Sequence, residues 1–97
     1  MTSARIPTAA VAVRAIRSGT LRVTDLVEVL LGRIERLDER IHAWVAVDRE
    51  GALAHARQLD DDVQRGRLLP LHGLPIGVKD VVDVAGLPTR AGYAPYA

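Results

Sequence analysis

Residues 24–41, TDLVEVLLGRIERLDERI, have the clearest structural pattern in this sequence. Apolar residues recur there three or four positions apart, a spacing that places them on one face of an α-helix. These residues are Val27, Leu30, Leu31, Ile34, Leu37 and Ile41. Thr24 is the predicted N-cap, and Asp25 suits the positive end of the helix dipole. The pattern therefore predicts an amphipathic helix that packs on other parts of the chain.

Two more helices are expected, one before and one after this stretch. The first covers residues 8–18 and ends at Gly19, a residue suited to the left-handed conformation that closes a helix. The second follows Asp48 as its N-cap and stops at Gly66. Its acidic run, residues 60–62, is expected on the solvated side of the helix. The predicted apolar faces of the two helices are Ala9, Ala12, Val13 and Ile16, and Ala52, Leu53, Ala56, Leu59 and Val63.

Two short apolar runs are candidates for extended structure. Residues 41–47, IHAWVAV, fit either a strand or a buried extended connection, and periodicity does not separate the two. Residues 76–84 are rich in valine and lie between loops containing glycine and proline, which is typical of a buried strand. On such a strand Lys79 and Asp80 point to opposite faces, so Asp80 is a poor direct partner for the lysine.

Composition limits the class of protein. Ninety-seven residues allow a single domain, and 48% hydrophobic residues are more than a domain of this size hides easily. Thirteen basic and twelve acidic residues leave a net charge of +1, which argues against a nucleic-acid partner. The absence of cysteine excludes a disulfide scaffold and a cysteine nucleophile. Neither a membrane-spanning run nor a signal-peptide pattern is present, so we expect a cytoplasmic protein without a membrane partner.

Lys79 is the only lysine among thirteen basic residues. Arginine stays protonated in proteins, whereas a desolvated lysine can lose its proton and act as a base. Burial in an apolar strand would supply that desolvation. The alternative is a lysine at the strand edge whose amine reaches water, which composition alone favours.

The other polar residues favour structural interpretations. His72 precedes a glycine in a loop and is expected to contact solvent or the strand rather than to act as a base. Asp80 and Asp83 could form a carboxylate pair, but on a strand they point to opposite faces. His42 and His55 lack the spacing of metal ligands. These residues therefore predict no metal site.

Residues 70–92, PLHGLPIGVKDVVDVAGLPTRAG, closely resemble the lysine-bearing segment of the amidase signature family. Residues 16–48 are similar to that family's usual lead-in, and the resemblance extends from about Ala10 to the end of the chain. It implies an α/β fold, in which a mixed sheet is sandwiched by helices. Residues 1–97 would then be a single incomplete domain, with a helical lead-in over 1–66 and a loop, the lysine-bearing strand and a second loop over 67–97.

The resemblance also implies a chemistry. Enzymes of this family hydrolyse or transfer amides through a serine nucleophile, a second serine in a cis peptide and a lysine. The resemblance thus implies a reaction with no metal and no organic cofactor. Lys79 matches the family's lysine, whose neutral amine accepts a proton relayed through the second serine. Ser3 and Ser18 are the only serines here, and neither lies in a glycine-rich turn. Tyr93 stands where the family often has serine.

We therefore expect an amidase-type hydrolase of carbon–nitrogen bonds in carboxamides, with Lys79 as the one catalytic residue present. These residues alone are expected to be inactive, because the serines of the triad are missing. The expected partners are a small-molecule amide and either a complementary C-terminal chain or a second copy. The alternative is a non-catalytic helical binding module, or a remnant of an amidase gene without function.

Overall fold

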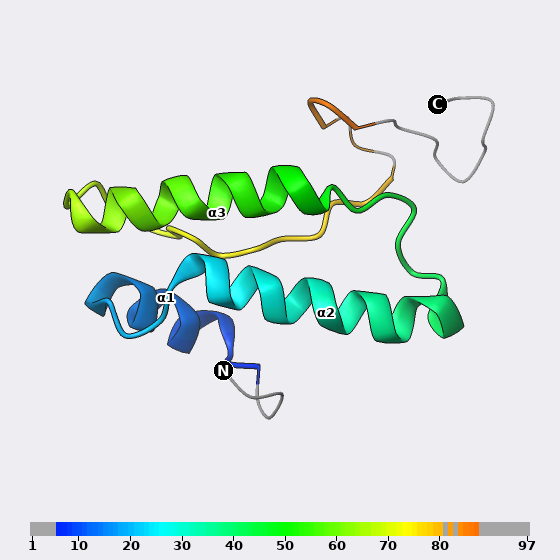
Figure 1. The fold of residues 1–97 in the computed structure, drawn as a ribbon, viewed down its shortest axis with the longest axis horizontal. Coiled ribbons are helices and arrows are strands. Elements are labelled where there is room, and N and C mark those ends of the chain that lie inside the picture. Colours follow the sequence, from blue (N-terminus) through cyan, green and yellow to red (C-terminus); the bar gives the residue numbers. More distant parts are fainter. Residues whose placement is uncertain (1–5, 81, 83, 88–97) are drawn as a thin grey trace.

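The computed structural model describes residues 6–80, 82 and 84–87 of the chain. Its helices are α1 (Ala9–Ser18), α2 (Val23–Ile41) and α3 (Arg49–Gln64). Helices α2 and α3 lie side by side as an antiparallel hairpin, and α1 lies near the end of the hairpin at which α2 begins (Figure 1). The three helices predicted from apolar periodicity are confirmed.

The predicted ends of α1 and α3 are confirmed by their capping contacts. The Thr8 hydroxyl oxygen accepts a hydrogen bond from the backbone N–H of Val11 at 3.3 Å, and Gly19 closes α1 with a φ of 82°. Asp48 caps the start of α3 in the same way, and Gly66 follows its end with a φ of 72°. Side-chain acceptors satisfy N–H groups at a helix start, and glycine takes the left-handed conformation without steric cost.

The start of α2 differs from the prediction. The helix begins at Val23, and Arg22 occupies the N-cap position without a side-chain hydrogen bond, so Thr24 lies inside the first turn. The capping group comes instead from α3, where the Asp60 carboxylate accepts from the backbone N–H groups of Val23 at 2.6 Å and Thr24 at 3.0 Å. The prediction of Thr24 as N-cap was wrong because an acceptor from another helix meets the same N–H groups.

The core lies between the three helices. It consists of Ala12, Ile16, Val23, Leu26, Val27, Leu31 and Ala56. The apolar face predicted for α2 is buried toward its N-terminus, whereas Leu37 and Ile41 are exposed, Ile41 at 63%. The second half of α2 thus keeps apolar surface that the described residues do not cover.

The connection between α2 and α3 is irregular rather than a strand. Helix α2 ends at Ile41 and is capped by His42, which adopts a left-handed φ of 56°. The Asp38 carboxylate then accepts from the backbone N–H groups of Ala43 at 2.6 Å and Trp44 at 3.0 Å. Of the two alternatives for residues 41–47, the structure therefore has a connection, but one that is largely exposed to solvent.

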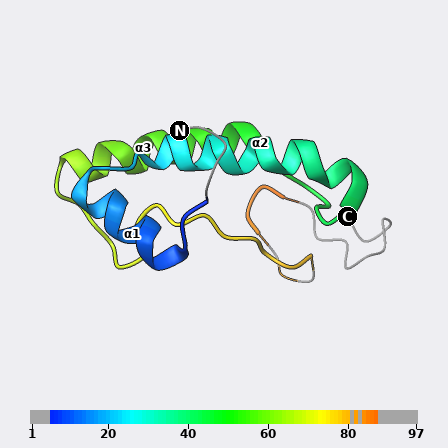
Figure 2. The same cartoon turned by 90° about the horizontal axis from the view of Figure 1, so that it is seen from below.

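Residues 67–80, which we call the lysine segment, run back along the helical hairpin. The segment lies over the line between α2 and α3, on the same side of the hairpin as α1 (Figures 1 and 2). None of its residues forms a strand.

The predicted α/β fold is wrong for the part of the chain that the structure describes. That part is helical, and its one recorded β-pairing is an isolated bridge between Val84 and Leu87. The strand predicted over residues 76–84 does not form, although positions 81 and 83 lie outside the described residues. A strand needs a neighbour for its backbone hydrogen bonds, and the described residues offer none along this run. None of the described helices is both long and apolar enough to cross a membrane.

Candidate functional site

The lysine segment begins with two tight turns beside α1. The backbone N–H of His72 donates to the carbonyl of Leu69 at 3.2 Å, and the N–H of Leu74 donates to that of Leu71 at 3.1 Å. The Arg17 guanidinium of α1 also donates to the carbonyl of Leu69, at 3.1 Å. The segment is therefore fixed to α1 where it starts along the hairpin.

His72 attaches the segment to α3. Its side chain is only 3% exposed, and Nε2 lies 2.9 Å from the carbonyl oxygen of Leu59. Because a carbonyl oxygen only accepts, Nε2 carries the proton of this hydrogen bond. Nδ1 is buried and has no hydrogen-bond partner among the described residues. The prediction of a histidine in contact with solvent or a strand was wrong, because the loop folds into the helical core.

Gly73 brings the segment's backbone against the core. It has a φ of 79°, and a Cβ atom built on it would lie 2.5 Å from Cγ2 of Val23 and 3.1 Å from Cδ1 of Ile16. Those distances leave no room for a side chain. Gly73 is thus required both by its left-handed conformation and by close packing against α1 and α2.

A second contact lies farther along the segment. Gly77 packs on the ring of Trp44, with 3.2 Å between an added Cβ and Cη2 of the indole. Around this contact lies an open, mainly apolar groove of about 350 Å³. Its lining residues are Leu30, Arg33, Ile34, Leu37, Asp38, Ile41, Ala43, Trp44, Pro75, Ile76 and Gly77. The α2–α3 connection therefore supports the segment just before the lysine.

Lys79 itself is exposed. Its backbone carbonyl accepts a hydrogen bond from the N–H of Val82 at 3.0 Å, so the chain turns at the lysine. The expectation that a buried strand desolvates Lys79 is not met by the described residues. Asp80 is partly buried, and Asp83 lies outside the described residues. The opposite faces expected for these two carboxylates depended on a strand, and that strand does not form.

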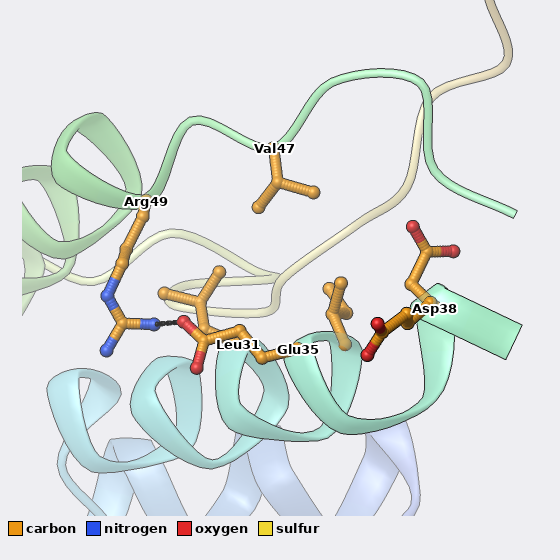
Figure 3. Close-up of a pocket in the computed structure, with 7 residues that line it drawn as sticks. Leu31, Glu35, Asp38, Val47 and Arg49 are labelled. Carbon is orange, nitrogen blue, oxygen red and sulfur yellow. Dashed lines mark hydrogen bonds and ion pairs between the residues drawn. The ribbon is translucent and has the colours of Figure 1, made fainter. Parts of the chain in front are cut away.

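A smaller hollow of about 320 Å³ lies between α2 and the start of α3 (Figure 3). Val47 points toward α2 there, and the Arg49 guanidinium contacts the Glu35 carboxylate at 2.6 Å. Both charged side chains are about half exposed or more, so solvent screens this ion pair. No serine, histidine or lysine lines the hollow, which makes it a weak candidate for acyl-transfer chemistry.

The surroundings of the Asp60 carboxyl shift its pKa. Burial raises the pKa of its carboxyl, but hydrogen bonds from Thr24 and Val23 and the charge of Arg22 lower it more. The pKa therefore lies below the ordinary value of 3.8. The expectation of a merely solvated acidic run was wrong for Asp60, whose carboxylate joins α3 to α2.

The described structure does not bring the remaining candidate residues together into one site. Ser18 is exposed at the end of α1, and its hydroxyl donates to the carbonyl of Ala15 at 3.1 Å. Ser3 and Tyr93 lie outside the described residues. His42 caps the C-terminal end of α2, whereas His55 lies within α3. No group of three or more potential metal ligands occurs among the described side chains.

The family model for amidases matches residues 25–97, a range that includes α3, the lysine segment, Lys79 and most of α2. This chain belongs to the amidase signature family. The family resemblance of residues 70–92 is thereby confirmed.

Relatives of this amidase-family chain are similar to it over most of its length. It is 46% identical over 86 residues to the A subunit of the glutamyl-tRNA(Gln) amidotransferase from Streptomyces coelicolor, covering 88% of this chain and 17% of that protein. The protein of the same name from Chloroflexus aggregans is 41% identical over 93 residues, covering 95% of this chain and 19% of the relative. The chain thus spans less than a fifth of the length of these curated relatives. No solved structure matches it.

Proposed function

We propose that this chain provides the lysine-bearing part of an amidase-type enzyme that breaks the carbon–nitrogen bond of a carboxamide. The observation that carries the proposal is Lys79, the only lysine of the sequence, in a motif that resembles the lysine motif of the family. Hydrolysis and transamidation both begin by breaking this bond. The relatives' name, amidotransferase, leaves either reaction open to this chain.

In the proposed reaction the hydroxyl oxygen of a serine attacks the amide carbon, and its proton passes through a second serine to the neutral amine of Lys79. The carbon–nitrogen bond then breaks, the departing nitrogen takes up the proton, and an acyl-serine ester remains. Water or another acceptor releases the acyl group. Lys79 serves as the base, and backbone N–H groups stabilise the oxyanion. No metal or organic cofactor takes part.

The two serines of this reaction have to come from chain outside residues 1–97. Ser18 supports the end of α1, and Ser3 lies in the same N-terminal lead-in, far in sequence from the glycine-rich lysine segment. A complementary C-terminal chain could supply these serines, and either that chain or a second copy could supply a surface that covers the lysine segment. Packing of that surface on the exposed Lys79 would remove water from its amine, which favours the neutral form that a base requires.

A chimera tests the proposal. In the Streptomyces coelicolor relative, the matched residues are replaced by those of this chain, and release of ammonia from simple carboxamides and glutamine is measured in the assembled enzyme. We expect the Lys79 chimera to be active and the Lys79→Arg chimera to be inactive, because arginine cannot accept the proton. Asp80→Asn is the matched control beside the lysine and is expected to affect turnover much less. Near-normal turnover of a folded Lys79→Arg chimera would disprove the role of Lys79.

The second candidate is a non-catalytic helical binding module. It is favoured by the helical structure of the described residues and by the apolar groove around Trp44, where Ile76 is 77% exposed. Size-exclusion chromatography and thermal unfolding of the 97-residue chain separate the two functions. A monomer with one sharp unfolding transition would support the binding module. Self-association would instead support the amidase proposal, because apolar surface that the rest of an amidase domain should cover would then be exposed.

A further inference from the structure

The lysine segment is attached on both sides of a short span, to α3 on one side and to the α2–α3 connection on the other. On one side His72 is bonded to Leu59 of α3, and on the other Gly77 rests on the ring of Trp44. The four residue steps from Gly73 to Gly77 reach at most about 14 Å when extended. Pro75 within the span has a fixed φ, which further restricts its course.

We propose that His72 is a positioning residue for Lys79. The hydrogen bond from its Nε2 fixes where the span begins, and the Trp44 contact fixes where it ends, two residues before the lysine. The inference rests on the proposed function of Lys79, but its test does not measure catalysis. A negative result in this test would disprove the role of His72, whereas an inactive chimera would bear on the proposed function of Lys79, so the two failures can be told apart.

The contacts of the imidazole define which substitutions should preserve this role. Only Nε2 reaches the carbonyl oxygen of Leu59, whereas Nδ1 has no partner in the described part of the chain. Glutamine can place an amide N–H near the position of Nε2, but asparagine, one methylene shorter, places its amide near Nδ1. Both are neutral amides, so His72→Gln and His72→Asn differ mainly in whether the donor reaches α3.

Trp44 provides the reporter, because it is the only tryptophan of the chain and it contacts Gly77. We would measure its emission maximum and its quenching by acrylamide in dilute solutions of the 97-residue chain, with circular dichroism to monitor the helices. Gly77→Ala places a methyl group against the ring and is the positive control. Leu71→Ala, at a neighbouring exposed position of the segment, is the negative control.

We expect His72→Gln and Leu71→Ala to keep the wild-type emission and quenching. We expect His72→Asn to shift the emission to longer wavelength and to raise the quenching constant, with its helical signal retained. The proposal is overturned if folded His72→Asn keeps the wild-type values, or if His72→Gln changes them as much as His72→Asn does. It also fails if Gly77→Ala leaves the emission unchanged, because Trp44 and Gly77 then make no contact, or if His72→Asn loses its helices, because His72 then supports the whole fold.

Discussion

Asp60 of α3 holds the first turn of α2 through Thr24, whose hydroxyl and backbone N–H both donate to one carboxylate oxygen, at 2.5 and 3.0 Å. The other oxygen accepts from the N–H of Val23 at 2.6 Å. A helix start leaves several N–H groups without partners inside the helix, and here a neighbouring helix satisfies two of them. The contact therefore joins secondary structure and tertiary packing at one residue.

Asp60→Ala should lower the free energy of unfolding by about 0.5–2 kcal/mol, the range found when a helix-capping side chain is removed. Chemical unfolding followed by circular dichroism measures this difference. Asp61→Ala is the control, because Asp61 is the exposed neighbour on the same helix and should change stability by less than about 0.5 kcal/mol. Equal effects of the two substitutions would contradict the capping role of Asp60.

The contact between Asp60 and Thr24 also predicts that the stability of the chain depends on pH. The pKa of Asp60 is lowered in the folded chain from the ordinary value of 3.8, so the unfolded chain binds this proton more readily. The contribution of Asp60 is therefore fully present above that value and is lost as the pH falls below it toward the folded-state pKa. We expect the stability difference between wild type and Asp60→Asn to be constant above about pH 5 and to shrink in stronger acid. A difference that grows on acidification would refute this assignment.

Two glycines with similar positive φ angles allow backbone strain to be separated from packing. An alanine at Gly66, with a φ of 72° and open space around it, should cost about 1–2 kcal/mol from its left-handed conformation alone. At Gly73, with a φ of 79°, the added methyl group also meets Val23 and Ile16, and overpacking should add about 1–3 kcal/mol. Urea unfolding of the two variants measures both costs. If Gly73→Ala is no worse than Gly66→Ala, the segment does not pack closely on the core.

Substitutions at Lys79 should leave the stability of the 97-residue chain nearly unchanged. The side chain is exposed, and substitutions at such positions usually change stability by less than about 0.5 kcal/mol. Lys79→Met and Lys79→Arg are compared with wild type by thermal unfolding. A clear gain in stability for Lys79→Met would instead indicate that the amine is desolvated within this chain.

The purified 97-residue chain should show no amidase activity, because its sequence holds no serine in a glycine-rich segment. Simple aromatic and aliphatic amides and a serine-directed covalent probe are the reagents, with the Streptomyces coelicolor relative as the positive control. Stoichiometric labelling of the chain, or turnover that persists through purification, would mean that Ser3 or Ser18 takes part.

The features that could be read from the sequence are those formed within a few neighbouring residues. Apolar spacing indicated all three helices, and Gly19, Asp48 and Gly66 marked their ends. Such signals are visible in one dimension because the contacts join residues three or four positions apart. The family was also recognisable from a continuous motif around Lys79, which the match over residues 25–97 confirms.

The contacts that join α3 to α2 and to the lysine segment connect residues far apart in sequence. Asp60 lies 36 positions from Thr24, and His72 lies 13 positions from Leu59. The sequence shows a glycine after His72, but it does not identify Val23 as the neighbour of that glycine. Only folding brings these groups together, because a hydrogen bond or a packing contact depends on distance in space rather than along the chain.

The strand predicted over residues 76–84 is another feature that depended on tertiary structure. Its valine-rich composition was typical of a strand, but a strand is stable only when another one accepts and donates its backbone hydrogen bonds. The described residues offer it no neighbouring strand, so the run stays irregular and turns at Lys79. Local composition therefore determined where the helices form, whereas the presence or absence of a pairing partner in three dimensions decided whether this run became a strand.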